Sequence, residues 1–187
     1  MTANDSAFLR VARVLDPVAI HSGHLVAWLI IPMVLGLSYE VVARYGFNAP
    51  TLWAYDMTFM MYGTFFMLGS AYTLQRKGHI RTDSFYAEWS ARRQAWTDAV
   101  CYLVMFMPFV AIFLWTGWEY FLKSYQTGER FVSSPWMALA WPFKAVMPIT
   151  GALLAIQGVA EICKCFHTIQ TGKWPDESIP LTEKATT

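Results

Sequence analysis

The sequence predicts an all-α membrane protein with four transmembrane helices, short amphipathic helices at the membrane surface, and both termini in the cytoplasm. Residues 99–118 contain no charged side chain, and three other segments are similarly apolar. Only 14% of the 187 residues are charged, well below the roughly 25% of an ordinary soluble domain. Because a helix rises about 1.5 Å per residue, about 20 apolar residues cross a hydrocarbon core of about 30 Å.

The apolar segments define the domain organisation. We expect a cytoplasmic amphipathic segment over residues 1–23, a membrane domain over 24–165, and a cytoplasmic tail over 166–187 whose proline and scattered charges are typical of disorder. Within the membrane domain, the expected spans are residues 24–42, 53–74, 99–121 and 142–163.

Two prolines and one lysine modify these spans. Pro32 and Pro108 lie inside the first and third spans, and each should bend its helix because proline lacks the N–H that an interior position donates. The uncharged part of the last span is short, so we expect Lys144 to extend towards the lipid headgroups and lengthen it.

The orientation follows from lysine and arginine, which are enriched in cytoplasmic loops. Of the 14 such residues, ten fall in the two tails and in the loop between the second and third spans. Both termini are therefore expected on the cytoplasmic side. Six aromatic residues would then gather near the outer interface: Trp53, Tyr55, Trp115, Trp118, Trp136 and Trp141.

Two segments outside the spans have the pattern of amphipathic helices. One lies in the N-terminal segment, where Phe8, Val11, Leu15 and Val18 recur at helical spacing. The other, over residues 83–96, combines aromatic and basic residues: Phe85, Trp89, Arg92, Arg93 and Trp96. Basic helices with aromatic anchors lie in the membrane plane. They could only seat the bundle, or they could brace a partner subunit.

The candidate polar residues lie near the outer ends of the spans, and we expect no charged group at the bilayer midplane. Glu40 and Arg44 are four residues apart and can pair on one helical face. Asp56 falls in the first turn of its span, where a carboxylate meets the positive end of the helix dipole. It could be structural, through that dipole or through Arg44, or it could contact a partner protein, a substrate or an ion.

Nothing in the sequence indicates a catalytic or cofactor site. All four histidines, His21, His24, His79 and His167, lie at or beyond the expected cytoplasmic ends, so they cannot be the facing axial ligands of a haem inside the bundle. His79 and Asp83 could hydrogen-bond across one helical turn, but two ligands are too few for a metal. We therefore expect no cofactor, no metal and no enzymatic activity, and the net charge of +1 does not suggest nucleic-acid binding.

Small residues offer a candidate helix-packing face. Gly151, Ala155 and Gly158 recur at intervals of four and three residues in the last span, and such faces allow close helix contact in lipid. They could pack the four spans against one another or dock a larger membrane protein.

The stretch from Tyr39 to Pro50, followed by Trp53 and Asp56, resembles the small membrane subunit of TRAP transporters, the DctQ-like family. The resemblance continues through residues 69–74 to Gly-His-Ile-Arg-Thr-Asp at 78–83, which includes His79, Arg81 and Asp83, and it covers about residues 25–165. Many family members carry glutamate where this chain has Asp56, so a contact made there would have a shorter reach.

The resemblance implies a tripartite transporter of the bacterial inner membrane. A periplasmic binding protein captures a substrate, usually an organic acid, and a large membrane subunit imports it with sodium. The small subunit would be an accessory scaffold that holds neither substrate nor sodium. Two other functions remain open: a self-sufficient small membrane carrier, and a membrane scaffold unrelated to transport.

Overall fold

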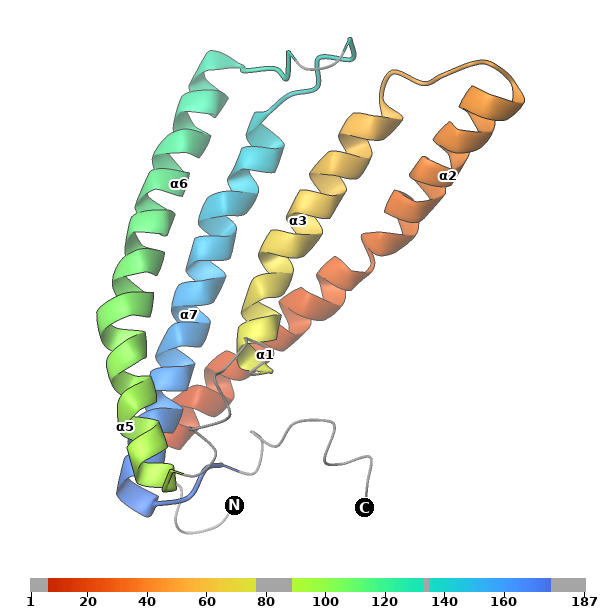
Figure 1. Ribbon diagram of the computed structural model, residues 1–187. Coiled ribbons are helices and arrows are strands. Elements are labelled where there is room, and N and C mark those ends of the chain that lie inside the picture. The colour runs from red at the N-terminus through yellow and green to blue at the C-terminus, as the bar shows by residue number, and fades with distance from the viewer. Residues whose placement is uncertain (1–6, 77–88, 133–134, 176–187) are drawn as a thin grey trace, which may run out of the picture. The chain divides into compact units, whose positions relative to one another are not determined.

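The computed structural model describes residues 7–76, 89–132 and 135–175 (Figure 1). Over these ranges the secondary structure is helical and no strand forms, which confirms the all-α fold class. The helices are α1 (Ala7–Ala27), α2 (Ile30–Gly46), α3 (Ala54–Gln75), α5 (Ala91–Cys101), the π-helix η1 (Tyr102–Phe106), α6 (Met107–Thr127) and α7 (Trp141–Thr171).

Three helical segments of the described chain are long and apolar enough to cross a membrane: Ala7–Gly46, Ala91–Thr127 and Trp141–Thr171. Helix α3, the second expected span, is 22 residues long but is not among them. Its hydroxyl groups are nevertheless satisfied within the helix, since Thr58 and Thr64 donate to carbonyl oxygens four residues earlier. The number of spans and their orientation stay predictions.

The first apolar segment is broken where Pro32 requires it. Helix α1 ends at Ala27 and α2 begins at Ile30. In an unbroken helix the N–H of residue 32 would donate to the carbonyl of Trp28, four residues earlier, but proline has no N–H. Instead the N–H of Ile31 donates to the Trp28 carbonyl at 3.3 Å. The helix therefore breaks one turn before the proline.

The helix that contains the expected third span begins within the segment expected as a surface helix, residues 83–96. Residues 83–88 lie outside the described chain, and helix begins at Ala91 and continues without interruption to Thr127. One irregularity occurs within it, the π-turn η1 just before Pro108, where the Met107 N–H bonds the Tyr102 carbonyl five residues earlier. The wider turn accommodates the proline without ending the helix.

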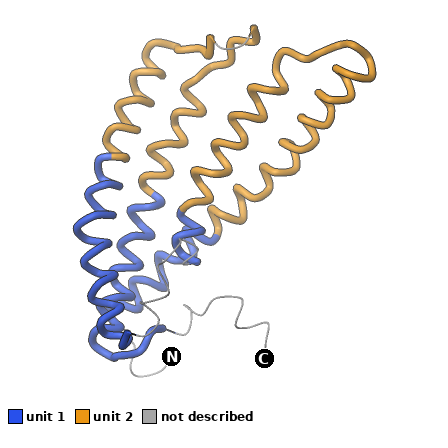
Figure 2. The backbone as a smooth tube through the Cα atoms, in the orientation of Figure 1, with its two compact units in different colours: residues 1–20, 71–112, 153–187 blue, residues 21–70, 113–152 orange. Residues whose placement is uncertain are grey.

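The described chain forms two compact units (Figure 2). The first unit comprises residues 1–20, 71–112 and 153–187. Its buried apolar side chains are mostly small, which allows helix backbones to approach closely: Leu9, Ala12, Ala19, Ala71, Leu74, Ala95, Ala99, Val110, Ala160 and Cys165. Phe8 and Phe166 add a stacked aromatic pair with ring centroids 5.7 Å apart.

The second unit comprises residues 21–70 and 113–152, and its packing depends more on aromatic rings. The ring of Phe143 lies 5.5 Å from that of Phe59, centroid to centroid. It also fills the space beside Gly63, where a Cβ atom would lie only 2.7 Å from the ring. Tyr125 meets Trp141 edge to face at 5.6 Å. Because Gly63 has no side chain, the ring of Phe143 on α7 can pack closely against α3 in this unit.

Many large apolar side chains of the long helices are exposed. Leu25, Phe66 and Met105 are each more than 70% exposed. In water such surfaces would drive association, whereas in a bilayer they face hydrocarbon chains. This exposure is what a membrane-embedded helical protein requires.

Candidate functional site

The connection between α2 and α3 is organised by Glu40, which lies on the last turns of α2 and is 6% exposed. Arg44 Nε donates to Glu40 Oε1 at 2.8 Å, and the backbone N–H of Thr51 donates to Glu40 Oε2 at 2.9 Å. The Arg44 guanidinium and the Thr51 hydroxyl make further contacts with the same carboxylate. One buried carboxylate therefore binds its own helix and the following loop together.

Trp53 and Asp56 follow this loop directly. The Trp53 ring stacks on Tyr39 of α2, with centroids 6.1 Å apart. Asp56 lies in the first turn of α3 and is 6% exposed, so its carboxylate is at the positive end of the helix dipole. Tyr39, Glu40, Arg44 and Trp53, from the first part of the resemblance, thus take part in contacts at the α2–α3 connection of the second unit. The other predicted positions, His79, Arg81 and Asp83, lie outside the described residues.

The candidate packing face on α7 contacts the preceding long helix. A Cβ atom at Gly151 would lie 3.1 Å from the Cα atom of Leu114 in α6, and one at Gly158 would lie 2.7 Å from the ring of Phe106 in η1. Ala155, between them, is half-buried. The two glycines face neighbours within this chain.

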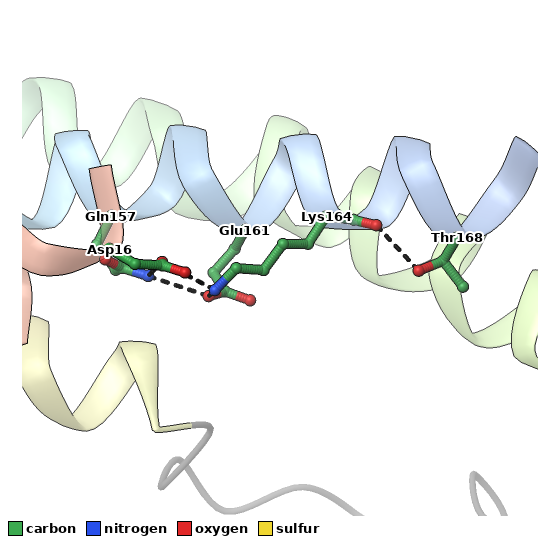
Figure 3. A network of polar contacts seen from close by, with 5 residues as sticks. All are labelled: Asp16, Gln157, Glu161, Lys164 and Thr168. Carbon is green, nitrogen blue, oxygen red and sulfur yellow. Dashed lines mark hydrogen bonds and ion pairs between the residues drawn. The ribbon is translucent and has the colours of Figure 1, made fainter. Parts of the chain in front are cut away.

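A buried ionic cluster in the first unit was missed by the sequence analysis (Figure 3). Lys164 Nζ on α7 donates to Asp16 Oδ1 on α1 at 2.8 Å and to Glu161 Oε1 at 2.9 Å. Gln157 Nε2 donates to the same two oxygens, each at 3.0 Å. The charged side chains are all less than 8% exposed. Two carboxylates, one ammonium and one amide therefore join α1 to α7.

A signal for this cluster is present in the sequence. Gln157, Glu161, Lys164 and Thr168 recur at intervals of four, three and four residues, which places them on one face of a helix. The sequence analysis drew nothing from this face, although Gln157 and Glu161 lie inside the expected last span. No local pattern pairs Asp16 with a residue 148 positions away.

A second ion pair involves Lys144, the residue at the start of the expected last span. Its side chain is only 6% exposed and pairs with Glu129 in the α6–α7 connection. Its ammonium also lies 3.7 Å from the centroid of the Tyr120 ring, a cation–π geometry. The Lys144 ammonium is therefore held by partners at the α6–α7 connection. Its hydrogen bond to the Glu129 carboxylate holds the pKa of that carboxyl below its ordinary value.

The polar clusters of the described residues can be compared with the geometry that a metal site requires. In the described ranges, no group of three or more histidine, cysteine or acidic side chains is placed to hold a metal ion. Each cluster joins segments of the fold. Fold and clusters together define a helical membrane protein whose polar groups are used structurally.

The family follows from comparison with known proteins. The model of the family described as "Tripartite ATP-independent periplasmic transporters, DctQ component" matches residues 33–168. The match covers more than half of the chain, and the chain belongs to this family. It is a family of transporter components and not of enzymes. No individual curated protein matches the sequence significantly.

Proposed function

We propose that this protein is the accessory small membrane subunit that frames the large, substrate-carrying subunit of a tripartite transporter. Membership of the family supports a small subunit of such a transporter. We further propose that the complex lies in the bacterial inner membrane, receives an organic acid from a periplasmic binding protein, and imports it with sodium. The family's usual chemistry supports these finer points.

The observation that carries the accessory role is the use of the buried charges. Asp16 and Glu161 are both held by Lys164, and Lys144 is held by Glu129. A carrier needs buried polar groups that exchange partners with a substrate or an ion. These groups are engaged with one another, and the exposed surfaces of the long helices are apolar. Such a bundle is suited to packing against another membrane protein.

Reconstitution tests the accessory role. We expect proteoliposomes with a sodium gradient to accumulate substrate only when they contain this chain, the large subunit and the loaded binding protein. Sustained uptake by this chain alone would establish the self-sufficient carrier instead. Omitting only this chain from the complete system is the matched control, and unchanged uptake would contradict a required accessory role.

Copurification separates the proposal from a scaffold unrelated to transport. After mild detergent extraction, the tagged chain should retain a large multi-span membrane protein encoded beside it. Extraction without such a partner, under conditions that leave the chain helical, would favour the unrelated scaffold. The Asp56→Asn variant should affect this assembly more than ion coupling if the carboxylate is structural.

A further inference from the structure

The first turn of α5 borders a cavity of about 420 Å³ in the first unit. We call it the Trp–Arg cavity, and it is lined by Trp89, Arg92, Arg93, Trp96 and Thr97. Arg92 and Arg93 lie in the first turn of α5, Trp96 follows them about one turn later, and Trp89 precedes the helix. Both arginines are exposed, and Trp89 and Trp96 are 43% and 58% exposed. Two guanidinium groups and two accessible indole rings therefore line the same cavity.

The electrostatics of this turn favour an anion. Arg92 and Arg93 lie at the positive end of the α5 dipole, where cations are unfavourable, and the first turn contains no acidic residue. Among the residues that the structure describes, no carboxylate forms an ion pair with either guanidinium. An anion in the cavity would be attracted by two guanidinium groups and by the positive end of the helix dipole.

The wall of the cavity is fixed by contacts from the end of α7. The indole Nε1 of Trp174 donates to Gln94 Oε1 at 3.0 Å, which ties the segment after α7 to the first turn of α5. A Cβ atom at Gly172 would lie 3.6 Å from Arg92 Nε, an ordinary van der Waals distance. The arginines thus project from a turn held by a second segment, unlike arginines on an isolated surface helix.

The surroundings of the Trp–Arg cavity favour a lipid as the molecule that supplies the anion. The helix that begins at Ala91 is one of the three able to cross a membrane, so its first turns lie near the headgroups. Beyond Trp96 the same face continues with exposed apolar residues, Val100, Leu103 and Val104. The helix face therefore changes from cationic and aromatic to purely apolar, in the order of a phosphate headgroup and its acyl chains.

We propose that the Trp–Arg cavity binds the phosphate of an anionic glycerophospholipid, with the acyl chains along Val100, Leu103 and Val104. Arg92 and Arg93 would hold the phosphate oxygens, and the two indoles would flank the glycerol region. The site depends on membrane insertion but not on transport, so it would stand even if the accessory role failed.

Binding to the purified full-length chain in detergent tests the proposal. Short-chain phosphatidylglycerol, phosphatidylcholine of the same chain length, and inorganic phosphate are titrated separately, and the bound mass is read by native mass spectrometry. We expect phosphatidylglycerol to bind most tightly. The double variant R92Q/R93Q should weaken this binding about tenfold or more, because two charge-assisted hydrogen-bonding groups are lost.

Two further variants keep the result interpretable. R10Q/K123Q removes the same charge from exposed positions outside the cavity and should leave binding unchanged. R92K/R93K retains the charge and should bind more tightly than the glutamine variant. Equal binding of phosphatidylcholine, unchanged binding in R92Q/R93Q, or inorganic phosphate binding as tightly as phosphatidylglycerol would each overturn the proposal.

Discussion

Lys164 shows how a single residue can hold a membrane bundle together. Its ammonium is shared by Asp16 and Glu161, and all three side chains are nearly inaccessible. Burying an ion is costly, and the cost is offset only when the charges meet with good geometry and remaining polar atoms are bonded. Gln157 contributes by donating to the same two carboxylates. Removing the ammonium would leave two carboxylates close together without a cation.

We expect Lys164→Met to lower the thermal midpoint of the detergent-solubilised protein strongly, because breaking a buried pair costs about 3–5 kcal/mol. The exposed Lys173→Met is the control and should have little effect. Neutralising the partners as well, in D16N/E161Q/K164M, should recover much of the loss. A single Lys164→Met variant as stable as the parent chain would contradict the structural role.

The Glu129–Lys144 pair predicts a pH-dependent contribution to stability. The folded-state pKa of the Glu129 carboxyl is below its ordinary value of 4.5 because Lys144 donates to it. The pair therefore stabilises the fold at pH values above the unfolded-state pKa, and this contribution is lost as pH falls through the folded-state value.

Thermal midpoints of the parent chain and of Glu129→Gln should therefore differ at neutral pH and converge in acid. The parent chain is expected to be the more stable at neutral pH. Lys173→Gln, an exposed change in the first unit and away from Glu129, serves as the control. A difference that persists unchanged well below pH 4.5 would show that charge does not carry the effect.

At the scale of the helices, prolines decide where the long apolar segments change direction. Pro32 interrupts the first segment four residues upstream, at Trp28 and Leu29, and Pro108 follows the π-turn η1. The two outcomes differ because the backbone hydrogen bonds are interrupted near Pro32, whereas before Pro108 they continue through one wider turn. Both positions were predicted from the sequence, but not which outcome each would have.

Helix packing on α7 gives an element-scale prediction from a matched pair of glycines. A Cβ atom at Gly151 would lie 3.1 Å from the Leu114 backbone, whereas one at Gly36 would meet nothing within 4 Å. Gly151→Val should therefore lower the thermal midpoint by an overpacking cost of about 1–3 kcal/mol. Gly36→Val should not. Equal effects of the two substitutions would indicate that helix propensity, not packing, dominates.

At the scale of the whole molecule, the charge distribution predicts orientation. Ten of the 14 lysines and arginines lie in the tails and in the loop between the second and third spans, so both termini should be cytoplasmic. Reporter fusions at each end check this: a reporter active only in the cytoplasm should be active at both. Activity of a periplasm-specific reporter at either end would contradict the proposed topology.

The local features of the fold were largely predictable, and the long-range contacts were not. Helical segments follow from uncharged stretches such as 99–118, and the Glu40–Arg44 pair follows from a spacing of four. The ion pair between Asp16 and Lys164 joins residues 148 positions apart. The burial of Lys144 depends on Glu129 and on the ring of Tyr120, and neither partner is marked by a local pattern.

The sequence by itself determined that this chain is helical and built for a bilayer. The reason is that the length and polarity of each segment set the free energy of its transfer into lipid. Its family was also readable, from the residues around Arg44 and Asp56. Only the tertiary structure decided how Asp16, Glu161 and Lys164 neutralise one another, and that Trp89, Arg92, Arg93 and Trp96 line one cavity. The physical reason is that the energy of a buried charge depends on which groups surround it in space, whatever their distance along the chain.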